Sequence, residues 1–79
     1  MAYIFTDHAA RRMQQRDITR RQVRETIEQP QESWRDKEMK DRLIHVRTYE
    51  RGRLKVVWTP ENDDAYIVTA VWLEEGGKT

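Results

Sequence analysis

One histidine and a series of arginines lie at helical spacing near the start of the chain. His8, Arg12 and Arg16 are each four residues apart, so on an α-helix each lies only about 40° around the axis from the one before. Arg11 lies on the other side of His8, while the small and apolar residues between them turn away toward a core. The spacing therefore predicts one imidazole among three guanidinium groups on the solvent side of a helix.

The position of His8 at the start of this predicted helix determines what its ring can do. Unpaired backbone N–H groups and the helix dipole disfavour an imidazolium there, and nearby arginines act in the same direction, although Asp7 opposes them. A neutral imidazole can accept a proton as a general base. Guanidinium groups match phosphate oxygens, so these residues could activate a ribose 2′-hydroxyl and stabilise the charge on phosphorus without a metal.

A structural interpretation of the same residues stays open. A histidine at a helix start is often half-buried and bonded to backbone, and arginines commonly pair with acids such as Asp7 or Asp17. Spacing alone is a weak motif. On these residues by themselves, the structural interpretation is favoured over catalysis.

A second group of the same residue types lies on a predicted strand over residues 42–50. His45, Arg47 and Tyr49 alternate onto one face, where they would offer an imidazole, a phosphate ligand and a ring that stacks on a base. Lys55 on the next strand would add a second cation. The alternative is a solvated sheet face with ordinary cross-strand pairs, and the pattern favours that alternative.

The elements that must position these groups are two helices followed by strands. Helical patterns run from residue 7 to about 16 and from 20 to about 29, with Thr6 or Asp7 and Thr19 as caps. Strand patterns cover residues 42–50, 53–59 and 65–73, with a further one near 32–37. Because the strand connections are too short for a crossover, we expect an α+β fold: two N-terminal helices on one face of a three- to four-stranded antiparallel sheet.

Length and composition limit the classes of protein. Seventy-nine residues make one small domain, 1–79, in which the polar tail 74–79 is expected to fray. There is no cysteine, and the two histidines lack metal-ligand spacing, so neither a metal site nor a cofactor is expected. The apolar run over residues 1–5 is too short for a signal peptide or a membrane span. We therefore expect a cytoplasmic protein with no membrane partner.

Charge is distributed unevenly along the chain. The net charge is only +1, but residues 7–24 hold six arginines against two aspartates, a local net charge of +4. This pattern indicates a local anion site more than a general coat for nucleic acid. An arginine-rich solvated helix is the alternative.

The run His8-Ala9-x-x-Arg12-Met13-x-x-Arg16-x-Ile18 resembles the opening signature of the bacterial domain-of-unknown-function family 4258 (DUF4258). The resemblance covers about residues 5–73, although the later strands are similar by pattern only. That family is grouped with the RelE-like and BrnT-like toxins, in a small ribonuclease fold shared with barnase and colicin-type nucleases. The resemblance implies that the antiparallel sheet is bent. It also implies metal-independent RNA cleavage, with signature positions at His8, Arg12, Arg16 and Thr69.

The leading hypothesis is therefore a toxin-like endoribonuclease that cleaves RNA by 2′-hydroxyl attack on phosphorus. His8, Arg12 and Arg16 would be catalytic, and His45 and Thr69 would support them. The RNA strand would be bound by Arg11, Arg47, Tyr49 and Lys55. The alternative is a non-catalytic module that binds RNA or protein through the basic helix, and a third hypothesis is a domain that forms a homodimer through its strand edges. The resemblance implies an antitoxin protein as a partner.

Overall fold

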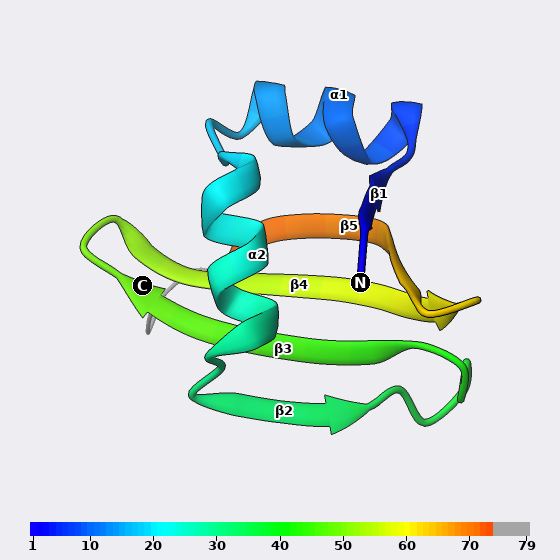
Figure 1. Ribbon diagram of the computed structural model, residues 1–79. Coiled ribbons are helices and arrows are strands. Elements are labelled where there is room, and N and C mark those ends of the chain that lie inside the picture. Colours follow the sequence, from blue (N-terminus) through cyan, green and yellow to red (C-terminus); the bar gives the residue numbers. More distant parts are fainter. Residues whose placement is uncertain (74–79) are drawn as a thin grey trace.

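The structure, a computed structural model, describes residues 1–73, so the tail expected at 74–79 lies outside the described residues. The elements follow one another as β1 (Tyr3–Phe5), α1 (Asp7–Gln15), α2 (Arg20–Glu28), β2 (Glu32–Arg35), β3 (Leu43–Tyr49), β4 (Gly52–Glu61) and β5 (Asp64–Leu73) (Figure 1). Two helices and an α+β class agree with the sequence prediction.

The prediction of a three- to four-stranded antiparallel sheet was wrong. The sheet has five strands in the order β1-β5-β4-β3-β2, and it is mixed because β1 pairs in parallel with β5. Antiparallel order was inferred from short connections, and it holds from β2 to β5. The parallel pair instead joins the two ends of the fold, where the whole intervening chain is the crossover.

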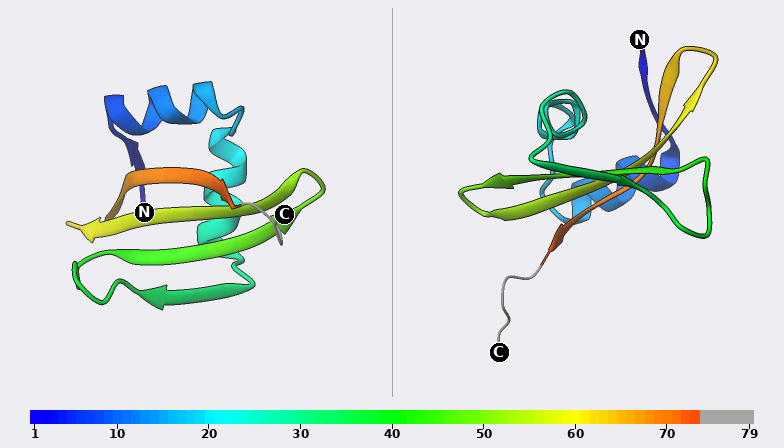
Figure 2. Two further views of the ribbon diagram at one scale, coloured as in Figure 1. Left: turned by 180° about the vertical axis from the view of Figure 1, so that it is seen from behind. Right: turned by 90° about the horizontal axis from the view of Figure 1, so that it is seen from below.

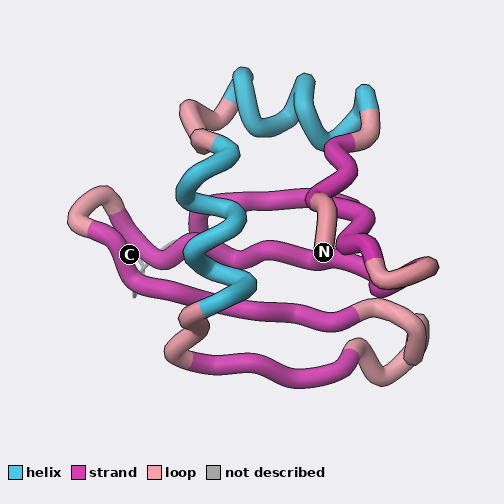
Figure 3. The backbone as a smooth tube through the Cα atoms, in the orientation of Figure 1, coloured by secondary structure: helices cyan, strands magenta, loops and turns pink. Residues whose placement is uncertain are grey.

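Capping residues define both helices. The Thr6 hydroxyl accepts a hydrogen bond from the Ala9 backbone N–H at 3.1 Å, and Thr19 forms a capping box with Gln22. Between the helices the backbone of Asp17 has a φ of 59°, the left-handed conformation that aspartate tolerates better than most residues. This bend turns α2 away from α1, so that α2 crosses the strands β3 and β4 (Figure 3).

One face of the sheet packs against both helices. Tyr3 and Phe5 of β1 share that face with alternate residues of β4 and β5. The views in Figure 2 show α2 on one side of the strongly twisted strands. The buried core consists of Ala9, Met13, Ile18, Val23, Ile27, Leu54, Val56, Trp58, Ala65, Ile67 and Ala70. The opposite face carries Ile44, Val46 and Val57, which are also nearly buried.

The hairpin between β4 and β5 has a turn at Asn62 and Asp63, both with positive φ, as a two-residue hairpin turn requires. Further along, the register shifts between Val57 and Trp58, whose partners are Thr69 and Ile67. Val68 is thus the extra residue of a bulge, and bulges bend a strand and increase its twist. This register shift is therefore the feature of the sheet that bears on the expected bend.

Candidate functional site

The solvent side of α1 carries three of the predicted site residues. His8, Arg11 and Arg12 are all exposed, and we call them the α1 surface. His8 lies in the first helical turn, directly after the Thr6 cap. Within residues 1–73 the arginines in ion pairs are Arg21, Arg51 and Arg53. The two arginines of the α1 surface therefore remain able to meet an external anion.

Arg16, the third member of the predicted catalytic stripe, is turned toward the sheet. Its guanidinium donates to the Ala70 carbonyl of β5 at 2.9 Å, and its own carbonyl accepts from the Trp72 indole N–H at 2.8 Å. β1 pairs with β5 only over residues 65–67, so Ala70 lies on a stretch of strand edge beyond β1. Arg16 therefore fastens α1 to that edge, and one of its donors is committed there.

The second predicted group, on β3, contacts the C-terminal end of α2. The His45 ring donates from Nδ1 to the Ile27 carbonyl at 3.1 Å, since a carbonyl can only accept. Arg47 donates to the Gln29 carbonyl at 2.7 Å. The last carbonyls of a helix have no partner within the helix and carry its negative dipole end. His45 and Arg47 supply those partners, so they serve as a cap.

Tyr49 completes this contact. Its hydroxyl lies 2.8 Å from the Glu25 carboxylate and 3.1 Å from the Gln22 carbonyl, and its ring packs edge-on against Trp72. Burial, together with the Glu25 carboxylate, raises the pKa of the Tyr49 hydroxyl. Since the ring is packed against Trp72 and the hydroxyl is bonded to α2, this side chain positions α2 on the sheet.

Lys55 and Thr69 lie on the other face of the sheet. Lys55 is directly opposite Val46, and Thr69 is directly opposite Val57. These positions alternate with the core residues of the same strands. The structure thus divides the predicted residues among the α1 surface, the contact of Arg16 with β5, the cap of α2 and the far face. It does not bring them all into one site.

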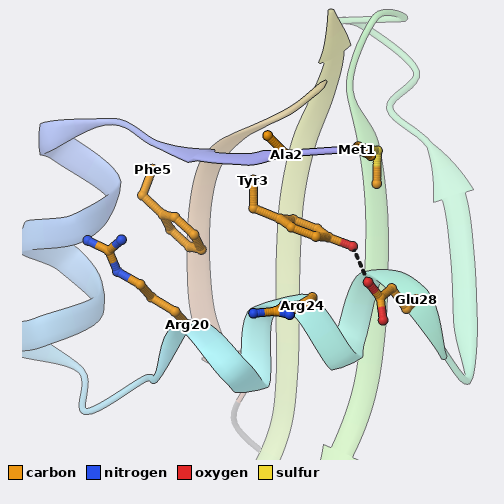
Figure 4. Close-up of a pocket in the computed structure, with 7 residues that line it drawn as sticks. All are labelled: Met1, Ala2, Tyr3, Phe5, Arg20, Arg24 and Glu28. Atoms are coloured by element: carbon orange, nitrogen blue, oxygen red, sulfur yellow. Dashed lines mark hydrogen bonds between the residues drawn. The ribbon is translucent and has the colours of Figure 1, made fainter. Parts of the chain in front are cut away.

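A pocket of about 400 Å³ lies between β1 and α2. It is lined by side chains from both elements, which face one another in Figure 4. The lining residues are Met1, Ala2, Tyr3, Phe5, Arg20, Arg24 and Glu28. None of the predicted site residues is among them. The sequence signal that could have found the pocket is the pairing of Tyr3-x-Phe5 on one strand face with Arg20-x-x-x-Arg24 on one helix face.

Two further properties bear on the kind of site. Residues 1–73 contain no cluster of three or more histidine or acidic side chains placed to hold a metal ion. Among the same residues, no helix has the length and apolar character to cross a membrane.

Comparison with known proteins gives one match. No curated protein matches the chain, and no solved structure does. The profile described as "Domain of unknown function (DUF4258)" matches residues 5–72, which includes every helix and nearly all of the sheet. That range begins within β1 and ends within β5, the two strands that close the fold. The chain therefore belongs to the DUF4258 family.

Proposed function

We propose that the protein binds RNA through the α1 surface, His8, Arg11 and Arg12. The observation that carries this proposal is the exposure of both arginines without a carboxylate partner among the described residues. Guanidinium groups are well suited to phosphate oxygens. The rest of the chain is net acidic, so binding is expected to be confined to this region.

RNA is favoured over other polyanions for two reasons. The basic surface is small, which suits a short single-stranded segment better than a long duplex. In addition, the signature around His8 and Arg12 resembles that of families grouped with the RelE-like and BrnT-like toxins, which act on RNA. The second reason is a resemblance, and it supports the proposal without testing it.

Cleavage of the bound RNA is the second candidate function, and the exposure of His8 one helical turn from Arg12 favours it. The His8 ring would remove the proton of a ribose 2′-hydroxyl while Arg12 holds the adjacent phosphate. The 2′-oxygen would then bond to phosphorus as the bond from phosphorus to the 5′-oxygen breaks. The products would be a 2′,3′-cyclic phosphate and a 5′-hydroxyl that has taken up a proton.

Binding is tested by fluorescence anisotropy with a labelled single-stranded RNA at several salt concentrations. Each phosphate contact contributes about one unit to the slope of log affinity against log salt. We expect the double variant Arg11→Gln/Arg12→Gln to bind at least about tenfold more weakly at low salt and to lose up to two units of slope. Arg21→Gln is the matched control, because Arg21 is exposed but pairs with Glu25. Equal affinity of the double variant and the control would exclude the α1 surface.

Cleavage is tested on the same RNA with a chelator present. If the protein cleaves, His8→Ala should retain RNA affinity and lose about 10²–10⁴-fold in rate, the usual contribution of a general acid or base. An unchanged rate in His8→Ala would remove His8 from the mechanism. If the unmodified protein binds the RNA but yields no cleavage products, binding remains the proposed function.

A further inference from the structure

The pocket between β1 and α2 holds two arginines against two aromatic rings. The Arg20 guanidinium carbon lies 4.7 Å from the centre of the Phe5 ring, and that of Arg24 lies 5.7 Å from the centre of the Tyr3 ring. Figure 4 shows both pairs facing the same space. A guanidinium held over a ring face keeps the N–H groups at its edge available as donors. The two cations are therefore positioned before any ligand arrives.

These two arginines are suited to a single anionic group. They lie one turn apart on α2, a rise of about 6 Å, which two guanidinium groups can bridge by binding different oxygens of one phosphate. In the part of the chain that the structure describes, neither arginine takes part in an ion pair. Glu28 is the carboxylate that lines the same pocket, and it forms an ion pair with neither of them.

The other end of the pocket has the opposite character. The Tyr3 hydroxyl donates to Oε2 of Glu28 at 2.6 Å, which fixes the carboxylate and leaves its second oxygen as an acceptor. Burial and this hydrogen bond raise the pKa of Tyr3 to about 12, so the donor keeps its proton at physiological pH. Glu28 lies roughly 12 Å along the helix from Arg20, at 1.5 Å per residue. The pocket therefore offers phosphate donors at one end and an acceptor at the other.

We propose that this pocket binds one nucleotide, with the phosphate between Arg20 and Arg24 and the base directed toward Glu28. A nucleotide has this same polarity, since its phosphate is anionic and the Watson–Crick edge of its base presents N–H donors. Guanine presents two adjacent donors there, which match a carboxylate. The inference deepens the proposed RNA binding, and it rests on that function for the choice of a nucleotide among phosphate compounds.

The first experiment measures binding of GMP, guanosine and inorganic phosphate to the full chain by isothermal titration calorimetry. GMP should bind more tightly than either of the other two, because it alone engages both ends of the pocket. Arg20→Gln and Arg24→Gln should each weaken GMP binding about tenfold. Arg21→Gln, one residue away on the solvent side of α2, should leave it unchanged. Equal GMP affinity in the pocket variants and in the control would overturn the proposal.

Glu28→Gln separates the two ends of the pocket. If the carboxylate contacts the base, this variant should weaken GMP binding about tenfold while phosphate binds as before or more tightly. A variant that binds GMP more tightly would show that Glu28 only repels the phosphate, and the proposed orientation would be wrong. Circular dichroism of each variant checks the fold, and Arg20→Lys provides a further comparison that keeps the charge and removes the planar donor pair.

A competition experiment distinguishes a nucleotide within RNA from a free nucleotide. A short single-stranded RNA should displace GMP if the pocket is part of the RNA interface, and it should leave GMP bound if the ligand is a free nucleotide. The Arg11→Gln/Arg12→Gln variant should bind GMP normally. If the unmodified protein binds GMP but no RNA, the proposed RNA binding alone is refuted, and if it binds RNA but no GMP, the pocket proposal alone is refuted.

Discussion

Each of the two histidines of the chain has an arginine within four residues of it, but the two histidine–arginine pairs have different surroundings in the fold. His8 and Arg12 lie on α1 and are exposed. His45 and Arg47 lie on β3, where both side chains bond to the last carbonyls of α2. The same residue types thus provide an exposed basic surface in one region and a helix cap in the other.

The difference lies in which backbone groups surround each histidine–arginine pair. His8 lies in the first turn of α1, where N–H groups give a cationic side chain nothing to bind. Arg12 lies in the last turn, and its side chain is exposed. The end of a helix presents unpaired carbonyls and a negative dipole, which attract imidazole and guanidinium donors. A His-x-Arg pattern on a strand therefore indicates a functional site only if no helix terminates over that strand.

The largest expected effect is the difference in folding stability between His45→Ala and His8→Ala. His45→Ala deprives the Ile27 carbonyl of its partner and removes an edge-on contact with Trp58, which should cost about 2 kcal/mol. The melting temperature should fall by about 8–16 °C for a domain of this size. His8→Ala should change stability by less than about 0.5 kcal/mol. Thermal unfolding of both variants measures the contrast, and equal losses would contradict the division of roles.

A smaller effect is expected for the matched arginines of α1. Arg16→Met removes the bond to the Ala70 carbonyl but keeps the aliphatic part of the side chain, so it should cost about 1 kcal/mol. Arg12→Met should be neutral in stability within about 0.5 kcal/mol and should weaken RNA binding instead. Urea unfolding and RNA anisotropy on the same samples separate the two. A loss of stability in Arg12→Met would mean that Arg12 is also committed to the fold.

The narrowest effect, confined to alkaline pH, is expected from Tyr3. Its pKa is about 12 in the folded chain against 10.0 for an ordinary tyrosine. Below pH 10 both states keep the proton and the stabilisation is complete. Between pH 10 and 12 the unfolded state loses the proton first, so stability falls as pH rises. We expect this loss of stability to be about 1 kcal/mol. It is smaller than the pKa difference alone would give, because the hydroxyl is close to solvent.

Tyr3→Phe should remove this part of the alkaline dependence, which urea unfolding at pH 9 and pH 11 can measure. The pKa of Tyr49 is also raised, so Tyr49→Phe serves as a comparison from the β3 region. If the unmodified protein and Tyr3→Phe lost the same stability between pH 9 and pH 11, the hydrogen bond to Glu28 would contribute nothing to folding.

Local patterns predicted the elements well, because caps and turns act within a few residues. Thr6 and Thr19 are cases in which the sequence signal and the structure agree. The pairing of β1 with β5 was missed, because no local pattern tells a three-residue segment which distant strand it will meet. The dimer, antitoxin and RNA partners stay predictions.

The candidate site was predictable only in part, for the same reason. The exposure of His8 and Arg12 follows from helical periodicity, and the structure has both on the solvent side of α1. The cap formed by His45 and Arg47 depends on where α2 ends relative to β3, which is a tertiary property. The pocket was missed because Arg20 and Arg24 acquire their partners only when β1 is placed beside α2.

The partnership of the first and last strands has a consequence for synthesis of the chain on the ribosome. Tyr3, Ile4 and Phe5 find their partners only when residues 65–67 have emerged, about 60 residues later. Contacts so distant along the chain form slowly. Until then, the apolar side of α1 lacks the strand that covers it, and a nascent polypeptide in this condition is prone to aggregate or to recruit chaperones.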